Sequence, residues 1–195
     1  MSGNGVGETV RTWWLMSLRP EHHPKIGEDT SAARALRARL RRPSAPTEVL
    51  AERAVHDLVR RVPALRKQPG DLIQLVCTLA EVKRERLEPN APRKRLAVRL
   101  GEAEEGGERP RMSDIRFQRL IRSEGADFGT ALRRALPLAG NTCDVAQLAR
   151  DMLAWSDPDR AEATRNDWCF DYFGAARPKD EDGAAGKETR GDESE

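Results

Sequence analysis

The sequence predicts an all-α fold, a helical bundle in two halves with about eight to nine helices. Charged residues make up 34% of the 195 residues and aromatic residues only 5%, so Leu, Val and Ala must build the core. Apolar residues also recur at helical spacing along most of the chain. The C-terminal stretch 174–195 consists mainly of Gly, Ala and charged residues, which predicts a disordered acidic tail.

Composition also divides the chain. We expect a flexible N-terminus at 1–9, an N-terminal helical half at 10–88, a linker with a short basic helix at 89–110, and a C-terminal helical half at 111–173. The formal net charge is +2, but the tail holds seven acidic and four basic residues, so the part that precedes it carries +5. This excess is concentrated in a few stretches, which indicates a local anion-binding surface.

The first expected helix has Thr9 as its N-cap and an apolar stripe that includes Trp13, Trp14 and Leu18. Because adjacent helical positions diverge, we expect one tryptophan to anchor the helix to the core. The other would border an interface or be only partly buried.

A first basic face is predicted at 29–42, where an apolar stripe is opposed by arginines and no acid occurs between Asp29 and Glu48. Basic residues in a last helical turn favour the helix dipole, which explains Arg41 and Arg42. Arg34 and Arg37 lie nearer the start of the helix and have no such explanation.

The remaining helices have apolar stripes typical of core. One helix should run from Pro46 to Pro63, and a second, capped by Asp71, is the most apolar of the chain and should be the centre of the bundle. Asp144 followed by Gln147 predicts a capping box. The last helix should begin at Asp157 and Pro158 and end in an aromatic patch that packs in the core, formed by Trp168, Cys169, Tyr172 and Phe173.

The second and stronger basic face lies at 109–134, in two short amphipathic helices. With Ser113 as N-cap and about 100° per residue, Phe117, Leu120 and Ile121 fall on one side. Arginines fall on the other side, together with a misplaced Ile115; they are Arg116, Arg119 and Arg122. Guanidinium groups grip phosphate oxygens through paired N–H donors. A solvated helix face is the alternative interpretation.

The sequence contains none of the common catalytic motifs beside the two basic faces. The sequence lacks a Gly-rich phosphate loop, an HExxH motif and a nucleophile elbow, so we expect no enzyme, no catalytic residue and no cofactor. Adjacent His22 and His23 have no third ligand, so we expect no metal site either. Three widely spaced cysteines indicate buried thiols in a reducing compartment. Without a signal peptide or membrane span, the protein is expected in the cytoplasm.

The order of the segments resembles the small subunit of Cascade, the type I-E CRISPR interference complex, also called the CasB family. The resemblance covers about residues 10–173. It is carried most clearly by the Arg-x-Ser-x-x-Arg-Phe-x-Arg-Leu run at 111–120, by LARDMLAW at 148–155, and by the closing W…DYF at 168–173. None of these is a catalytic signature.

The resemblance implies a non-catalytic subunit of an antiviral complex, present in two copies. Its implied partners are guide RNA, target DNA, other Cascade subunits and a second copy of itself, with no membrane. Such a subunit contacts nucleic-acid backbone and stabilises the R-loop without base recognition. The contacts carried over by position are Arg41, Arg42, Arg111, Arg116, Arg119, Arg133 and Arg134. Helix geometry alone adds Arg34, Arg37 and Arg122.

Two other functions remain open from the sequence. A helical DNA-binding regulator would read bases with a recognition helix, but no clear helix-turn-helix with Asn or Gln on its exposed face is evident. A helical adaptor could instead bind an acidic protein. Salt-dependent binding of a random single strand would separate these functions from backbone binding.

Overall fold

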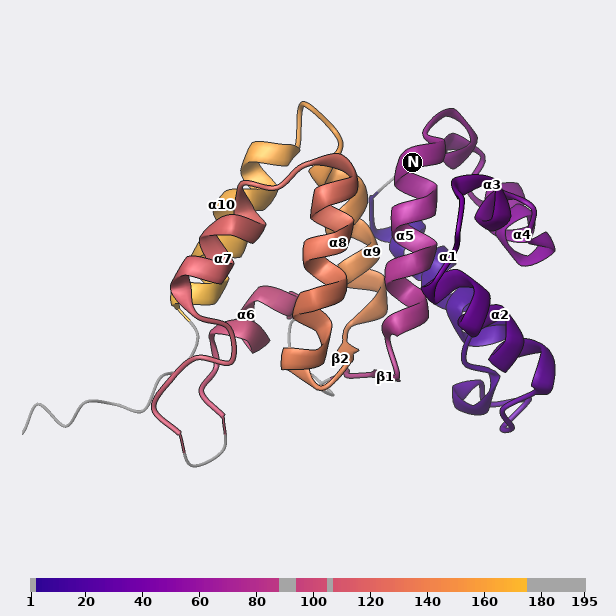
Figure 1. Ribbon diagram of the computed structural model, residues 1–195, viewed down its shortest axis with the longest axis horizontal. Coiled ribbons are helices and arrows are strands. Elements are labelled where there is room, and N and C mark those ends of the chain that lie inside the picture. The colour runs from indigo at the N-terminus through magenta and orange to yellow at the C-terminus, as the bar shows by residue number, and fades with distance from the viewer. Residues whose placement is uncertain (1–2, 88–93, 105–106, 175–195) are drawn as a thin grey trace, which may run out of the picture.

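The computed structural model describes residues 3–87, 94–104 and 107–174, and these residues fold almost entirely into helices (Figure 1). The all-α prediction is confirmed. The expected tail lies outside the described residues from 175 onward. The α-helices of the described part are α1 (Gly3–Ser17), α2 (Ser31–Arg41), α3 (Pro46–Leu50), α4 (Arg53–Arg61), α5 (Pro69–Glu81), α6 (Leu96–Gly101), α7 (Asp114–Ile121), α8 (Gly125–Ala135), α9 (Val145–Trp155) and α10 (Ala161–Phe173).

Short elements connect these helices. Three 3-10 helices, η1 (Pro20–His22), η2 (Pro63–Lys67) and η3 (Leu136–Ala139), lie in the connections. Strands β1 (Arg84–Glu85) and β2 (Thr142–Cys143) pair in parallel, which joins the end of α5 to the start of α9. Each strand has only two residues, so this sheet links two segments of the chain and does not form a layer of the fold.

Helix α1 differs from the expectation in where it begins and in how many of its tryptophans are buried. It begins at Gly3 rather than after Thr9, and the Thr9 hydroxyl donates to the Gly5 carbonyl inside the helix. Trp13 and Trp14 are both buried, which contradicts the expectation that only one points inward. The reason is that α1 packs against α9 on one side and α4 on another. Each indole is satisfied: Trp13 Nε1 donates to the carbonyl of Ala54 and Trp14 Nε1 to that of Leu79.

Helix α5 is central, as its apolar sequence predicts. It packs on α2, α8 and α9, and residues such as Leu75, Val76 and Leu79 are fully buried. The buried apolar side chains from α1 to α10 form one continuous cluster, so the N- and C-terminal stretches share a core. Cys77 and Cys143 are free buried thiols, as expected, and Cys169 is half-buried.

Three further helices differ from their predicted bounds. Helix α5 begins at Pro69 with Gln68 in the N-cap position, so Asp71 is not its cap. The helix expected from Pro46 to Pro63 is broken at residues 51–52 into α3 and α4. Helix α10 begins at Ala161 rather than at Pro158, because residues 157–160 form a turn in which Asp157 accepts the backbone N–H of Asp159. One half of the predicted capping box is confirmed, since the Asp144 carboxylate accepts the backbone N–H of Gln147 at 2.9 Å. The Gln147 side chain instead donates to Asp151 and accepts from Arg150.

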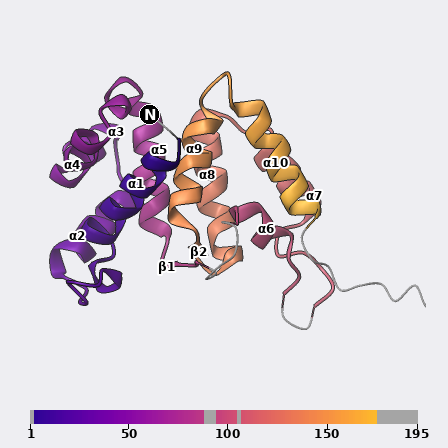
Figure 2. The ribbon, with the colours of Figure 1, turned by 180° about the vertical axis from the view of Figure 1, so that it is seen from behind.

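The helices are arranged so that one face of the molecule presents α7, α8, α5 and α2 in a row (Figure 1). Seen from behind, α10, α9 and α1 lie in front instead (Figure 2). Neighbours in the row are in contact, because α7 packs on α8, α8 on α5, and α5 on α2. The two basic faces predicted far apart in the sequence therefore belong to elements of one side of the fold. In the described part of the chain, no helix is long and apolar enough to cross a membrane.

Candidate nucleic-acid interface

A groove of about 360 Å³ lies between α7 and α8 and contains three of the predicted arginines. Its walls are formed by Arg116 and Arg119 of α7 and Arg134 of α8, and all three side chains are exposed. Its floor is apolar and consists of Met112, Leu120, Ala131 and Leu138. The sequence predicted the arginines but not the floor, because Met112 and Leu138 lie outside the two helices and reach the groove only through the tertiary fold.

Helix α7 is held in place by α10. The Phe117 ring stacks on the Tyr172 ring, with centroids 3.8 Å apart and an interplanar angle of 7°. The Tyr172 hydroxyl lies 2.5 Å from the Met112 carbonyl and 2.9 Å from the Asp114 carboxylate. Phe117 and Tyr172 are buried, so the arginines of α7 project from a fixed base. This supports the expectation that the aromatic patch is core, although Phe173 is half-exposed.

The groove arginines lack acidic partners. Within residues 3–87, 94–104 and 107–174, no carboxylate oxygen lies within 4.0 Å of the guanidinium of Arg116, Arg119 or Arg134. Arg122, at the C-terminal end of α7, is likewise exposed. Burying an unpaired charge is costly, so such groups remain at the surface, where an anion can pair with them.

Arg133 lies on the side of α8 that faces α5. Burial raises the pKa of the Cys77 thiol, and the neighbouring Arg133 guanidinium opposes this rise through its charge and a hydrogen bond. Arg133 is half-buried between the two helices. It therefore extends the positive surface from the groove towards α5.

Most arginines predicted on the first basic face, at 29–42, form ion pairs with carboxylates, and Arg37 does not lie on the surface. Its guanidinium is buried and donates to both carboxylate oxygens of Asp29, at 2.9 and 2.8 Å, and to the Leu18 carbonyl at 2.6 Å. This hydrogen bonding lowers the pKa of Asp29. The prediction that Arg37 is an exposed contact is therefore wrong, because the loop before α2 folds back and covers that side of the helix.

The other arginines of this face are accessible to different degrees. Arg34 is exposed but pairs with Asp29 at 3.5 Å. Arg41 is half-buried, donates to the Ala80 carbonyl at 2.9 Å and lies 3.4 Å from Glu81. Arg42 is exposed. Arg41 and Arg42 thus lie at the end of α2 that packs on α5.

Arg111 lies in a second small group of arginines that sequence patterns did not reveal. Burial lowers the pKa of Arg99, and the charges of Arg86 and Arg111 lower it further, so the three guanidinium groups are close enough to repel one another. Arg99 donates to Glu102 at 3.3 Å. The group combines the segment after β1, helix α6 and the loop before α7, and no spacing in the sequence brings these segments together.

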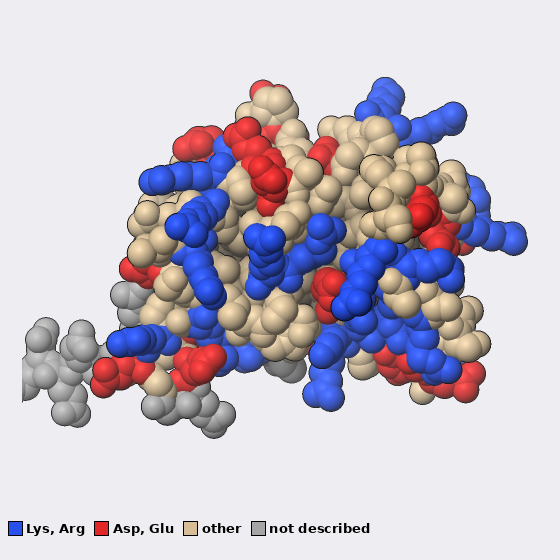
Figure 3. Space-filling model, viewed as in Figure 1, with Lys and Arg blue, Asp and Glu red and all other residues tan. Residues whose placement is uncertain are grey.

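Figure 3 shows the distribution of these charges on one side of the molecule. Lys and Arg side chains form a band that crosses α7 and α8 and continues towards α2, interrupted by isolated acidic side chains. We call this surface the basic band. It follows the row of helices in Figure 1. An elongated positive strip of this kind suits an extended polyanion better than a small anion.

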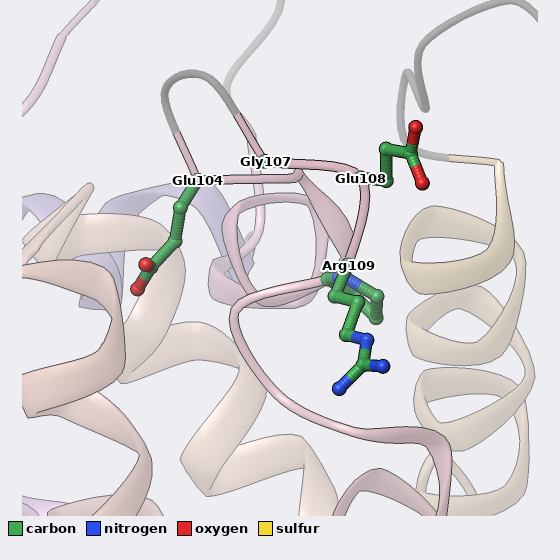
Figure 4. Close-up of a pocket in the computed structure, with 5 residues that line it drawn as sticks. Glu104, Gly107, Glu108 and Arg109 are labelled. Atoms are coloured by element: carbon green, nitrogen blue, oxygen red, sulfur yellow. The ribbon is translucent and has the colours of Figure 1, made fainter.

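A hollow in the loop before α7 does not offer comparable chemistry. A cavity of about 470 Å³ is lined by Glu104, Gly107, Glu108, Arg109 and Pro110. Figure 4 shows that Glu104, Glu108 and Arg109 point in different directions rather than converging. Among the described residues, no group of three His, Cys, Asp or Glu side chains could hold a metal ion.

Comparisons with known proteins agree with this architecture. A family model described as CRISPR-associated protein Cse2 matches residues 36–173. A chain in the crystal structure of E. coli Cascade bound to a PAM-containing double-stranded DNA target has a similar fold, with a TM-score of 0.53 and 20% sequence identity. The match covers 85% of this chain and 94% of that chain. No curated protein sequence matches. Because the family model spans most of the chain, the protein belongs to the CRISPR-associated Cse2 family.

Proposed function

We propose that this protein is a non-catalytic subunit of a guide-RNA-directed DNA-targeting complex in antiviral defence. Its role is to hold nucleic-acid backbone and stabilise the R-loop without sequence specificity. Membership of the Cse2 family and the fold shared with a chain of DNA-bound Cascade support this proposal. Its partners are then guide RNA, target DNA, other subunits and a second copy of the chain, in the cytoplasm.

The observation that carries the proposal is the grouping of Arg116, Arg119 and Arg134 around one groove without acidic partners among the described residues. R-loop formation replaces a DNA duplex by an RNA–DNA heteroduplex of similar stability. A few charge-assisted phosphate contacts can therefore shift the equilibrium towards the R-loop. Such contacts fix position without reading bases. Arg133, Arg41 and Arg42 extend the contact along the basic band, whereas Arg34 contributes less because Asp29 already neutralises part of its charge.

Two other functions make different predictions. Helix α7 exposes Gln118 among its arginines, which is a residue type that a sequence-reading regulator uses in the major groove. A regulator would bind one short sequence tightly and keep that preference at high salt. An adaptor for an acidic protein would bind no nucleic acid.

The proposal can be tested with the isolated chain and a random-sequence DNA oligomer. We compare the variant R116Q/R119Q with R60Q/R66Q, which removes two exposed arginines of α4 and η2, outside the row α7, α8, α5 and α2. The groove variant should lose about tenfold or more in affinity and reduce the slope of log K against log salt by about 2. The control should change little. Equal losses in both variants would contradict a localised backbone site.

A further inference from the structure

The groove between α7 and α8 combines a positively charged rim with an apolar floor. Binding of a nucleic-acid backbone requires only the charged rim. Arg116, Arg119 and Arg134 supply positive charge at the rim. Half-buried Ala131 and Leu138 supply the accessible part of an apolar floor, and Met112 and Leu120, which also line the groove, are buried. A site for phosphates needs charge and hydrogen-bond donors, and it gains nothing from an apolar floor.

We propose that this groove receives an unpaired nucleotide, with its phosphate against the arginines and its base against the apolar floor. This inference rests on the proposed function and adds the strand type and the part of the nucleotide that is bound. A base in a duplex hides both faces by stacking on its neighbours, whereas an unpaired base can be turned outward onto a protein surface. A guanidinium group can also stack on the exposed face of such a base.

The size of the groove agrees with this occupant. At about 360 Å³ it lies near the lower end of the range for small-ligand pockets, about 300 to 1,000 Å³. That volume suits a small occupant such as one nucleotide better than the width of a duplex. The rim arginines come from both helices, so a strand that crosses the groove has a cation on each side of the inserted base.

The chemistry of the floor also predicts how strong and how selective this contact is. Among the residues that the structure describes, no aromatic side chain lines the groove, and no side-chain amide or carboxylate lines it to read the edge of a base. The binding free energy contributed by the base should therefore be smaller than on an aromatic stacking platform, and similar for all four bases. Affinity should consequently depend on the presence of bases but hardly on their identity.

The test uses the full chain and three DNA probes with the same number of phosphates in the binding strand. The first is a single-stranded oligomer of about ten thymidines, the second is its fully abasic analogue, and the third is the oligomer in a duplex. Fluorescence anisotropy gives the dissociation constants at several salt concentrations. We expect the single strand to bind about three- to tenfold more tightly than the abasic strand, and more tightly than the duplex. Both single-stranded affinities should fall with salt in parallel, because their phosphates are equal in number.

Two variants locate the effect. Leu138→Gln removes apolar surface from a half-buried position of the floor without changing charge, and it should abolish the difference between the thymidine and abasic strands. Ile115→Gln makes the same kind of change at a 67% exposed position of α7 that does not line the groove, and the difference should persist. Circular dichroism of both variants checks the helices.

The outcomes separate this inference from the proposed function. Equal affinity for the thymidine and abasic strands would overturn the base-binding groove and leave backbone binding intact. The same holds if the duplex binds as tightly as the single strand. Absence of salt-dependent binding to all three probes would overturn the proposed function itself. Displacement of the thymidine strand by poly-glutamate at equal charge would instead indicate an acidic protein as the occupant, and would also overturn the inference.

Discussion

Asp151 places a carboxyl group in the interior of the C-terminal half. Its side chain is 4% exposed, accepts hydrogen bonds from Trp168 Nε1 at 2.9 Å and Gln147 Nε2 at 2.8 Å, and lies 3.4 Å from Arg95. Burial raises its pKa from 3.8 to about 6, and these three partners offset the rise only in part. Arg95 also contacts Asp167 and Asp171, so it links α6 to α9 and α10.

Because the pKa of Asp151 is raised in the folded state, the stability of the protein should depend on pH. Between about pH 4 and 6 the folded state binds a proton at Asp151 that the unfolded state has released, so the free energy of unfolding should fall as pH rises through that window. The decrease should be at most about 3 kcal/mol, with little further change above pH 7. Denaturant unfolding of the native chain and of Asp151→Asn at several pH values measures it. The variant cannot ionise there, so parallel pH profiles for the two proteins would contradict the assignment.

The arginines show what could be predicted for single residues and what could not. Helical spacing correctly placed Arg116 and Arg119 on an exposed surface, and the family resemblance supplied Arg134, which is also exposed. It failed for Arg37, because the pattern of one helix cannot reveal that a preceding loop returns and offers Asp29. It also failed for Trp13, which is buried together with its neighbour because α1 is covered on more than one side.

At the scale of elements, the contact between α1 and α9 depends on a glycine. A Cβ atom added to Gly7 would lie 2.5 Å from the Ala146 carbonyl oxygen and 3.0 Å from Arg150, so α1 can approach α9 this closely only without a side chain at that position. Gly5, two residues earlier in the same helix, has open space around the corresponding position.

These two glycines provide a matched pair of substitutions. Gly7→Ala should lower the free energy of unfolding by about 1 to 3 kcal/mol, because the backbone of α9 must move to relieve the overlap. Gly5→Ala should leave stability unchanged or raise it by up to about 1 kcal/mol, since alanine favours a helix more than glycine does. Thermal or denaturant unfolding of the three proteins checks this. If Gly7→Ala were as stable as Gly5→Ala, the close crossing of α1 and α9 would be wrong.

Element types were more predictable than element boundaries. The apolar run after Asp71 predicted α5 and the Asp144 cap predicted α9, because an apolar stripe and a local cap both depend on neighbouring residues. The cap predicted at Asp71 was wrong, since α5 begins at Pro69 with Gln68 in the N-cap position. The starts of α1 and α10 were wrong, since Thr9 and Asp157 have cap-forming side chains that the fold uses for other hydrogen bonds. Local sequence permits such caps but does not require them.

At the scale of the whole molecule, the order of helices determines the interface. The row α7, α8, α5 and α2 brings basic stretches separated by about half the chain onto one side, and it forms the basic band. The sequence predicted two basic faces but could not predict that they are continuous, because their alignment depends on long-range packing against α5. The groove floor is hidden from sequence analysis for the same reason.

If the basic band holds the backbone of an opened duplex, target binding by a reconstituted complex must depend on its arginines. We compare complexes that contain the native chain, R116E/R119E, or R60E/R66E as a control with the same change in charge outside the basic band. Phe117 and Leu120 still anchor α7, so circular dichroism and complex assembly should be unchanged for the groove variant.

Binding of the complex to double-stranded target DNA is the measurement. R116E/R119E should weaken target binding and unwinding by about tenfold or more, with a larger loss at lower salt, whereas R60E/R66E should behave like the native chain. Unchanged target affinity of a complex that contains a folded R116E/R119E subunit would contradict this role of the basic band, because the arginines of α7 would then form only a solvated surface.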